Sequence, residues 1–456
     1  MKNIIKSVSI ALITIILAVS CSMTGSVSDT QSGSTSSQSS SGNRPGNPPG
    51  GKPGSSSSSI TYSGAVEIST SDSQSNQTYA SSTSDESALL ISTSEDVTIE
   101  NPTVTKSGSS DGGDNCNFYG LNAAVLVKGG STTTISGGTI TSDASGANGV
   151  FSYGGNGGSN GASGDGTTVI ISDTTITTTG SGSGGIMTTG DGITKAYNLT
   201  VTTSGQSSAA IRTDRGGGTV TVDGGTYTSN GLGSPAIYST ADITVENATL
   251  VSNLSEGVCI EGKNSITLTN CDLTASNTKC NGNAKFLDTI MIYQSMSGDA
   301  DSGTSSFTMT GGSLTSNKGH VFHVTNTNAV INLSDVDIVN NDGDVLLSVC
   351  ADGWSGASNI ATLNASGQVL SGTILVGSDS TFTLNLKGSS TFTGSFSGSI
   401  TNAAGGTVST SIGTVNVTIE SGSTWVLSAD TYVSTLTNNG TINTNGHILY
   451  VNGVAY

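Results

Sequence analysis

The sequence predicts an all-β protein whose chain winds as a parallel β-helix, a stack of coils with three strands each. Three observations predict this fold. Two strands of alternating apolar residues recur along the chain, a turn of fixed length joins them, and a further apolar strand precedes each of the later eight pairs and follows the last. One such unit buries its apolar side chains only against neighbouring units, so stability comes from stacking many coils.

The second and third strands of each coil, which we call strands two and three, show the period of two typical of a half-buried strand. An apolar residue or Thr is followed two positions later by an apolar residue, and five positions after that by another. Ile266, Leu268 and Leu273 form one such set. The pattern occurs in nine successive units, beginning at Val97.

The turn between strands two and three contains only Asn, Gly or Asp at its key position. These residue types tolerate a left-handed backbone, so a turn of constant geometry is expected in every coil. The residues are Asn101, Gly137, Asp173, Asn198, Gly224, Asn247, Asn270, Gly311 and Asp335.

The remaining strand of each coil, strand one, is expected to point a further apolar column inward. Most spacings in this column indicate about 22–26 residues per coil, and longer spacings indicate insertions. The expected inward residues are Val125, Phe151, Ile186, Ile211, Ile237, Cys259, Ile290, Phe322 and Leu346.

The turn column and the three-strand coils resemble the right-handed parallel β-helix of the pectate-lyase-like superfamily, over roughly residues 97–350. The resemblance implies the hand of the coil. It does not imply one activity, because that superfamily includes lyases, hydrolases, adhesins and carbohydrate-binding proteins.

Residues 1–20 are predicted to be a secretory signal, with two lysines before an apolar stretch at 10–19 that is short for a membrane span. Small residues directly before Cys21 resemble the bacterial lipoprotein signal, which implies lipidation of Cys21. An ordinary cleaved signal is the alternative. We expect a bacterial cell-envelope protein, anchored to the membrane by lipid and exposed outside the cytoplasm.

Residues 21–59 are rich in Ser, Gly and Pro and predict a flexible tether. We expect an N-terminal cap at 60–96, coils with inserted loops at 97–359, and shorter coils with a cap at 360–456. Trp425 and Tyr432 are expected to fill the C-terminal end, because an open last coil would expose an unpaired edge.

The composition argues against one class of fold and one class of partner. Charged residues make up 10 % of the chain and 63 residues are Gly, which argues against a coiled coil. The formal net charge of −18 argues against nucleic acid as a partner, since an acidic chain repels a polyanion. We expect a monomer.

Strand one carries the candidate ligand-binding face. Long insertions flank it at 105–124, 152–168, 274–289 and 291–306, and loops on both sides of one face predict the walls of a groove. The alternative is a strip that these loops cover. The outward residues are expected to be Leu126, Ser152, Met187, Arg212, Tyr238, Ile260, Met291, His323 and Leu347.

The densest charge cluster of this charge-poor chain is expected near the end of strand one. It could bind an acidic sugar through its arginines, act in a lyase, or serve as a structural ion-pair network. No paired-carboxylate motif of a hydrolase stands out, although Asp191 and Asp214 are conceivable partners. The cluster comprises Asp191, Arg212, Asp214, Arg215, Tyr238, Glu261 and Lys263.

Metal and disulfide predictions rest on weaker patterns. Asp299 and Asp301 lie at a spacing that suits Ca²⁺, the only cofactor the sequence suggests, with solvated loop acids as the alternative. Cys259 is expected in the core. In an oxidising setting Cys116, Cys271, Cys280 and Cys350 could form one or two disulfides, whose pairing the sequence does not define.

The leading functional hypothesis is a non-catalytic surface protein that binds carbohydrate or a host or extracellular surface through the groove over strand one. The first alternative is a polysaccharide lyase or glycoside hydrolase of the same fold, acting on acidic glycans. The second is ice binding, because Thr-x-Thr rows on strand three, such as Thr175 and Thr177, resemble those of ice-binding β-solenoids.

Overall fold

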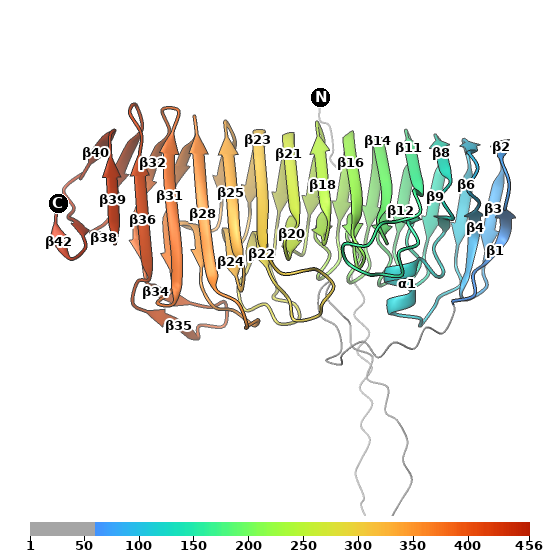
Figure 1. The fold of residues 1–456 in the computed structure, drawn as a ribbon, viewed down its shortest axis with the longest axis horizontal. Helices are drawn as coiled ribbons and strands as arrows, with labels where there is room; N and C mark the ends of the chain where they lie inside the picture. Colours follow the sequence, from blue (N-terminus) through green and yellow to red (C-terminus); the bar gives the residue numbers. More distant parts are fainter. Residues whose placement is uncertain (1–59) are drawn as a thin grey trace, which may run out of the picture. The chain divides into compact units, whose positions relative to one another are not determined.

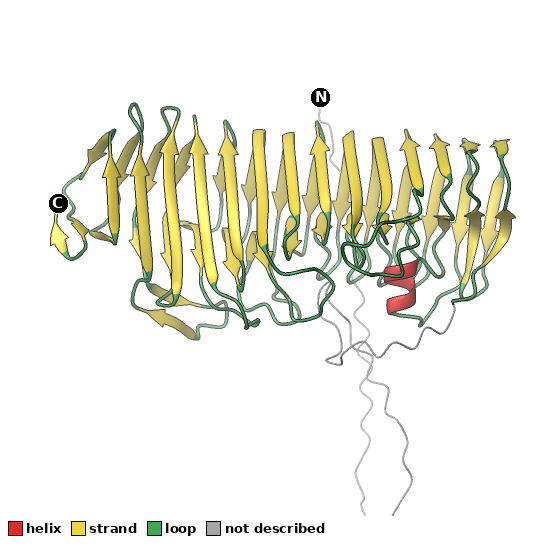
Figure 2. Cartoon of the chain, in the orientation of Figure 1, coloured by secondary structure: helices red, strands yellow, loops and turns green. Residues whose placement is uncertain are grey.

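The computed structural model describes residues 60–456 as a right-handed parallel β-helix, so the predicted fold class is confirmed. The signal, the tether and Cys21 lie outside the described residues. Figure 1 shows the coils in chain order from β1 to β42, and Figure 2 shows how few residues lie outside strands and loops. The described part of the chain contains one helix, α1 (Asp114–Tyr119). No helix among these residues is long and apolar enough to cross a bilayer.

Face one is the sheet formed by strand one of each coil. Its 13 parallel strands are β1 (Ser63–Ile68), β4 (Glu86–Ser92), β7 (Val125–Lys128), β10 (Val150–Tyr153), β13 (Ile186–Thr189), β15 (Ile211–Thr213), β17 (Ile237–Ser239), β20 (Val258–Glu261), β22 (Asp288–Tyr293), β24 (His320–Thr325), β27 (Val345–Val349), β30 (Thr373–Val376) and β33 (Phe396–Ser397).

Faces two and three, formed by strands two and three, join in one 20-stranded sheet. Face two contains β2 (Asp72–Ser75), β5 (Val97–Glu100), β8 (Thr132–Ser136), β11 (Thr168–Ser172), β18 (Asp242–Glu246), β25 (Asn328–Ser334), β28 (Asn359–Ser366), β31 (Ser380–Lys387), β36 (Thr414–Ile419) and β39 (Thr435–Asn438). Face three contains β3 (Thr78–Ser81), β6 (Thr103–Lys106), β9 (Thr139–Ser142), β12 (Thr175–Thr178), β19 (Thr249–Ser252) and β26 (Asp337–Asn340). Four strands run through both faces: β14 (Gly192–Thr203), β16 (Gly218–Ser229), β21 (Ser265–Ala275) and β23 (Thr304–Ser316).

The C-terminal coils continue in smaller sheets. A four-stranded sheet extends face three with β29 (Val369–Ser371), β32 (Thr391–Gly394), β37 (Thr424–Leu427) and β40 (Thr441–Asn443). A three-stranded sheet contains β38 (Thr431–Val433), β41 (Leu449–Val451) and β42 (Val454–Ala455), and β34 (Ser399–Thr401) with β35 (Thr407–Thr410) forms an antiparallel hairpin.

The turn column has the predicted backbone. All nine of its residues have φ between 50° and 74°, the left-handed region that Asn, Asp and Gly tolerate. The inward columns also pair as predicted. Ile243 pairs with Ile266, which pairs with Phe307, and all three lie in the continuous hydrophobic core.

The register of strand one differs from the prediction in three coils. The residues that pair into the inward column there are Val150, Val258 and Leu347, one position away from the predicted Phe151, Cys259 and Leu346. In these strands both neighbours of the inward residue are also buried, so burial does not alternate along the strand. The outward residues shift accordingly, from Ser152, Ile260 and Leu347 to Phe151, Cys259 and Ser348.

The N-terminal end of the stack, and one of the two residues predicted to fill the C-terminal end, differ from expectation. The segment predicted as an N-terminal cap contains a complete first coil, β1 to β3, which pairs with the coil above it. Trp425 is fully buried, whereas Tyr432 points outward, is 48 % exposed and stacks on Tyr450. No disulfide joins any of the five cysteines between residues 60 and 456.

Candidate functional site

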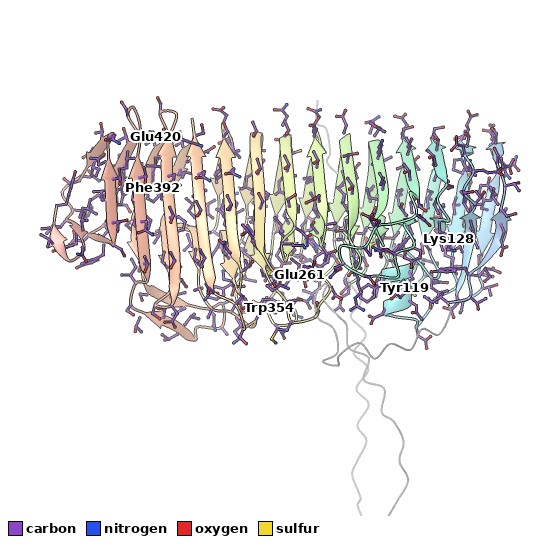
Figure 3. All side chains as sticks on the ribbon, viewed as in Figure 1. Tyr119, Lys128, Glu261, Trp354, Phe392 and Glu420 are labelled. Atoms are coloured by element: carbon purple, nitrogen blue, oxygen red, sulfur yellow. The ribbon has the colours of Figure 1, made fainter. Side chains whose placement is uncertain are left out.

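The outward side of face one is a covered strip instead of an open groove. Figure 1 shows α1 and the long loops along one edge of the coils, and Figure 3 shows Tyr119, Glu261 and Trp354 on that edge. The alternative interpretation, a strip covered by inserted loops, therefore describes the structure. Its nine outward residues are all buried: Leu126, Phe151, Met187, Arg212, Tyr238, Cys259, Met291, His323 and Ser348.

The covering segments form two apolar clusters with the strip. Near the N-terminal coils, Tyr153 and Met187 belong to one cluster, against which Tyr119 packs at the end of α1. Near the middle coils, Trp354 packs on Tyr293 with ring centroids 4.8 Å apart. Trp354 comes from residues 350–358, an insertion that the sequence pattern did not reveal.

The two arginines of the predicted cluster lie in ion pairs beneath these segments. Arg212 Nη2 is 2.6 Å from Asp214 Oδ2, and both side chains are 4 % exposed. Arg215 donates through Nε and Nη2 to Oδ1 of Asp299, and its guanidinium lies 4.3 Å from the ring centre of Phe118. The interpretation of this cluster as a structural ion-pair network fits both arginines.

Burial also changes the protonation of Asp214. It raises the pKa of this carboxyl to about 6, although the charge of Arg212 acts in the opposite direction. The nearby charge of Asp299 contributes to this rise in pKa. The network thus holds carboxylates close together, with the arginines stabilising their charged forms.

Glu261 is the most completely hydrogen-bonded carboxyl of the predicted set. Its Oε2 accepts from the hydroxyls of Tyr238 at 2.6 Å and Tyr293 at 3.0 Å. Its Oε1 accepts from Ser295 and Ser297 of the loop 294–303. Burial raises the pKa of Glu261 to about 7, because the hydrogen bonds only partly offset the loss of water. Glu261 therefore fastens the loop to face one.

Asp191 does not join the other members of the predicted cluster. It is an exposed residue with φ of 63°, and its Oδ2 accepts a hydrogen bond from the backbone N–H of Gly164 at 2.7 Å. Asp191 thus anchors the loop 154–167, while Asp214 binds Arg212. The two carboxylates do not act as a pair.

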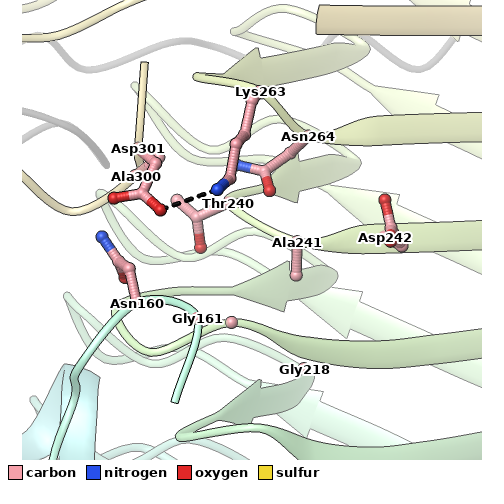
Figure 4. Close-up of a pocket in the computed structure, with 11 residues that line it drawn as sticks. Asn160, Gly161, Gly218, Thr240, Ala241, Asp242, Lys263, Asn264, Ala300 and Asp301 are labelled. Carbon is pink, nitrogen blue, oxygen red and sulfur yellow. Dashed lines mark ion pairs between the residues drawn. The ribbon is translucent and has the colours of Figure 1, made fainter. Parts of the chain in front are cut away.

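Lys263, the last member, lines an open pocket of about 150 Å³ at the end of strand one, which we call the Lys263 pocket (Figure 4). Lys263 Nζ is 2.9 Å from Asp301 Oδ2, and both side chains are about half exposed. The Oγ1 of Thr240, a buried residue of the lining, has no hydrogen-bond partner among residues 60–456. The full lining is Asn160, Gly161, Gly217, Gly218, Thr240, Ala241, Asp242, Lys263, Asn264, Ala300 and Asp301.

A second pocket, of about 300 Å³, is lined by Gln294, Ser302 and Gly303 of the loop 294–303, and we call it the Asn326 pocket. Gln294 in its lining is 8 % exposed and donates from Nε2 to the carbonyls of Ser295 and Ala300, which fixes the amide orientation. Its Oε1 accepts from no other described residue. The lining carries no charge: Gln294, Ser302, Gly303, Thr304, Asn326, Thr327, Asn328, Ala357, Ser358 and Ile360.

The predicted Ca²⁺ site is not formed. Asp299 binds Arg215 and Asp301 binds Lys263, so the two carboxylates turn to separate cations. Across residues 60–456, no three His, Cys, Asp or Glu side chains converge as metal ligands.

Sequence reasoning missed a cluster of His320, His323, Ser348 and Asp352. The three histidines, His320, His323 and His447, have no metal-site or catalytic spacing in the sequence. The register would have revealed the cluster, because His323 pairs directly with Ser348 on face one. The predicted register placed Leu347 there instead.

A third pocket, of about 350 Å³, lies in the C-terminal coils around Val369 and contains no predicted site residue.

In comparisons with known proteins, no family model, no curated protein and no solved structure matches this chain.

Proposed function

We propose that the chain is a lipid-anchored protein of the bacterial cell surface that binds carbohydrate without converting it. Binding occurs in the Lys263 and Asn326 pockets, at the rim of the loops that cover face one. The observation that carries this proposal is a pair of pockets beside one loop, each with a buried polar atom that lacks a described protein partner.

The chemistry of the Asn326 pocket suits a neutral, hydroxyl-rich ligand. Amides and hydroxyls both donate and accept hydrogen bonds, as sugar hydroxyls do, and the fixed Oε1 of Gln294 requires a donor from the ligand. An unpaired buried acceptor destabilises the empty site by roughly 1–3 kcal/mol, which a small movement toward a ligand hydroxyl would recover. The volume of about 300 Å³ lies at the lower end of small-molecule sites.

The enzyme alternative has less support. A lyase needs a base that reaches the substrate, but Arg212 is buried beside Asp214 and Arg215 holds the loop through Asp299. Glu261 is buried under four hydroxyl donors. No pair of carboxylates from the predicted cluster faces one of the pockets.

A glycan array with the full-length protein in detergent tests the proposal. Asn328 and Asn332 offer a matched pair, since both lie on β25 and each Nδ2 donates to a threonine hydroxyl at 3.1 Å. Only Asn328 lines the pocket. We expect Asn328→Ala to weaken binding about 10-fold, the value of one hydrogen bond, and Asn332→Ala to bind as wild type.

Binding of no glycan, or equal losses in the two variants, would contradict the proposal. Release of unsaturated or reducing sugars from a polysaccharide would overturn the non-catalytic assignment. Metabolic labelling with a fatty-acid analogue tests the anchor, and Cys21→Ser should abolish the label.

One observation favours a second candidate function, ice binding. Five Thr-x-Thr rows of face three pair in register, so ten threonines form two straight columns at the strand spacing of about 4.8 Å. All ten are exposed or half-buried, namely Thr103, Thr105, Thr139, Thr141, Thr175, Thr177, Thr200, Thr202, Thr226 and Thr228. Thermal hysteresis that Thr177→Lys abolishes would support this function, and its absence in wild type would remove it.

A further inference from the structure

The histidine cluster, His320, His323, Ser348 and Asp352, forms a continuous chain of polar contacts on face one. Ser348 Oγ lies 2.7 Å from Nδ1 of His323 and 2.7 Å from Nδ1 of His320. His323 Nε2 lies 3.2 Å from Asp352 Oδ2. His323 and Ser348 are fully buried, and so is the side chain of Asp352.

Ser, His and Asp in this order also occur in nucleophilic active sites, but here the serine has no access to a substrate. Phe286 stacks on His323 with ring centroids 4.6 Å apart and covers it. None of the three pockets described above is lined by His323, Ser348 or Asp352. The cluster therefore needs another explanation.

The donors and acceptors balance when the histidines are neutral. His323 Nε2–H donates to Asp352, and its Nδ1 then accepts the Ser348 proton. Ser348 Oγ in turn accepts from His320 Nδ1–H. A proton added to His320 places a positive charge in this buried cluster, with its ring centroid 6.5 Å from that of His323.

The cluster connects two covering segments to the sheet. Asp352 belongs to residues 350–358, and its Oδ1 accepts hydrogen bonds from the backbone N–H groups of Gly353 and Lys285. Lys285 belongs to residues 276–287, as does Phe286. Asp352 thus ties both segments to each other and, through His323, to β24.

The segment 350–358 is also a wall of the Asn326 pocket. Ala357 and Ser358 line the pocket, and the Ala357 N–H donates to Asn326 Oδ1 at 2.7 Å. Movement of this segment would take away part of the lining.

We propose that the histidine cluster is an acid-sensitive latch, which holds residues 276–287 and 350–358 on face one and so keeps the Asn326 pocket formed. As a regulation of carbohydrate binding, the latch rests on the function proposed above for that pocket.

The direction of the pH effect follows from His320. Burial, together with the smaller effect of the neighbouring His323, lowers the pKa of His320 from 6.5 to about 3, while Asp342 acts in the opposite direction. A histidine exposed by opening binds its proton near pH 6.5, so the closed state is fully stable above that pH and loses stability as the pH falls toward 3. At pH 4.5, two units below 6.5, opening is favoured about 100-fold more than at neutral pH.

Other titratable or charged groups surround the cluster from each packed element. Asp342 pairs with Lys318 at 2.7 Å, and its negative charge favours the protonated form of His320. The full set is Lys318 and Asp342 from the turns beside β24 and β26, Asp288 from β22, Cys280 and Lys285 from residues 276–287, and Cys350 from the end of β27.

The experiment compares the full-length protein with His320→Asn and His447→Asn. Asparagine keeps an N–H donor near the position of Nδ1 and cannot be protonated. His447, in the C-terminal coils near Asp430, is the matched control. Amide hydrogen exchange of residues 276–287 and 350–358, corrected for intrinsic rates, gives the opening equilibrium at about pH 8 and pH 4.5.

Tryptophan fluorescence provides a second readout of the same opening. Trp354 is 5 % exposed on the segment 350–358, and the only other tryptophan, Trp425, is buried in the C-terminal coils. Trp354→Phe identifies which part of the emission belongs to the latch.

We expect wild type and His447→Asn to open about 100-fold more at pH 4.5 than at pH 8, with a red shift of the Trp354 emission. His320→Asn should lose most of this change. Equal protection of wild type at both pH values would overturn the latch, and this result decides even if His320→Asn does not fold. The same pH dependence in His320→Asn as in wild type would also overturn it.

A neutral-oligosaccharide array at both pH values separates the two proposals. If residues 276–287 and 350–358 open at pH 4.5 but the protein binds no oligosaccharide at pH 8, the latch is supported and the binding function is contradicted. Binding at pH 8 that persists at pH 4.5 with the segments still protected contradicts the latch alone.

Discussion

Replacing Glu261 by glutamine should remove a pH dependence from the stability of the middle coils. Burial raises the pKa of Glu261 from 4.5 to about 7, against the opposing effect of the hydrogen bonds from Ser295 and Tyr238. The folded state thus holds a proton that the unfolded state has released between these pH values. The stability from this group is fully present below pH 4.5 and is lost as the pH rises through about 7.

The magnitude follows from the two pKa values. The difference of 2.5 (7 − 4.5) at about 1.4 kcal/mol for each pH unit corresponds to about 3 kcal/mol. Glutamine keeps the size of the side chain, and the facing hydroxyls of Tyr238 and Tyr293 can accept from its N–H₂ group. Relative to Glu261→Gln, wild type should therefore lose about 3 kcal/mol between pH 4.5 and pH 8.

Amide hydrogen exchange in β20 and β22 measures the opening free energy of these coils in both proteins. Glu420→Gln is the control, because Glu420 is exposed at the opposite edge of the coils (Figure 3). Other titrating groups change the opening free energy equally in wild type and variant, so their contribution cancels when one value is subtracted from the other. A difference that stays constant from pH 4.5 to pH 8 would refute the reasoning, because Glu261 would then not titrate differently in the folded state.

Three further predictions concern single coils and loops. Gly225→Ala should lower the free energy of unfolding by about 2 kcal/mol or more, because Gly225 has φ of 96° and an added Cβ would lie 2.3 Å from a backbone oxygen. Gly224→Asn should leave the stability nearly unchanged, and thermal unfolding compares the two variants. Arg215→Ala should lower the free energy of unfolding by about 2–4 kcal/mol, because it leaves the buried Asp299 without its partner. Lys263→Ala, which removes an exposed ion pair, should lower it by less than about 1 kcal/mol, and urea denaturation measures both values. Trp425→Ala should cost about 3–5 kcal/mol and raise hydrogen exchange in β37 and β40 first.

Much of the fold could be predicted because each coil repeats the same constraints. Turn residues such as Asn270 and Gly311 mark positions that require a left-handed backbone, and the alternation on faces two and three has one polar side. The register of strand one was harder to predict, because loops bury its outward side. Where Val258, Cys259 and Ile260 are all buried, alternation cannot show which residue points inward.

The candidate site could be predicted only in part. Sequence indicated that charged residues gather at the end of strand one, and Arg212 and Asp214 do meet. The separation of Lys263 into an open pocket depends on where the loop 294–303 lies, which no local pattern determines. Trp354 and the histidine cluster depend on contacts between residues of different coils, and these contacts follow from the register.

Because each winding is held by its neighbours along whole strands, a break in the covalent chain need not release a fragment. A protease that cuts within residues 154–167 would leave β10 bound to β7 and β13, and β11 bound to β8 and β14. Clipped molecules should therefore migrate as two bands in a denaturing gel but elute as one intact particle in gel filtration. Such tolerance to nicking is a direct benefit of the coiled architecture for any protein exposed to secreted proteases.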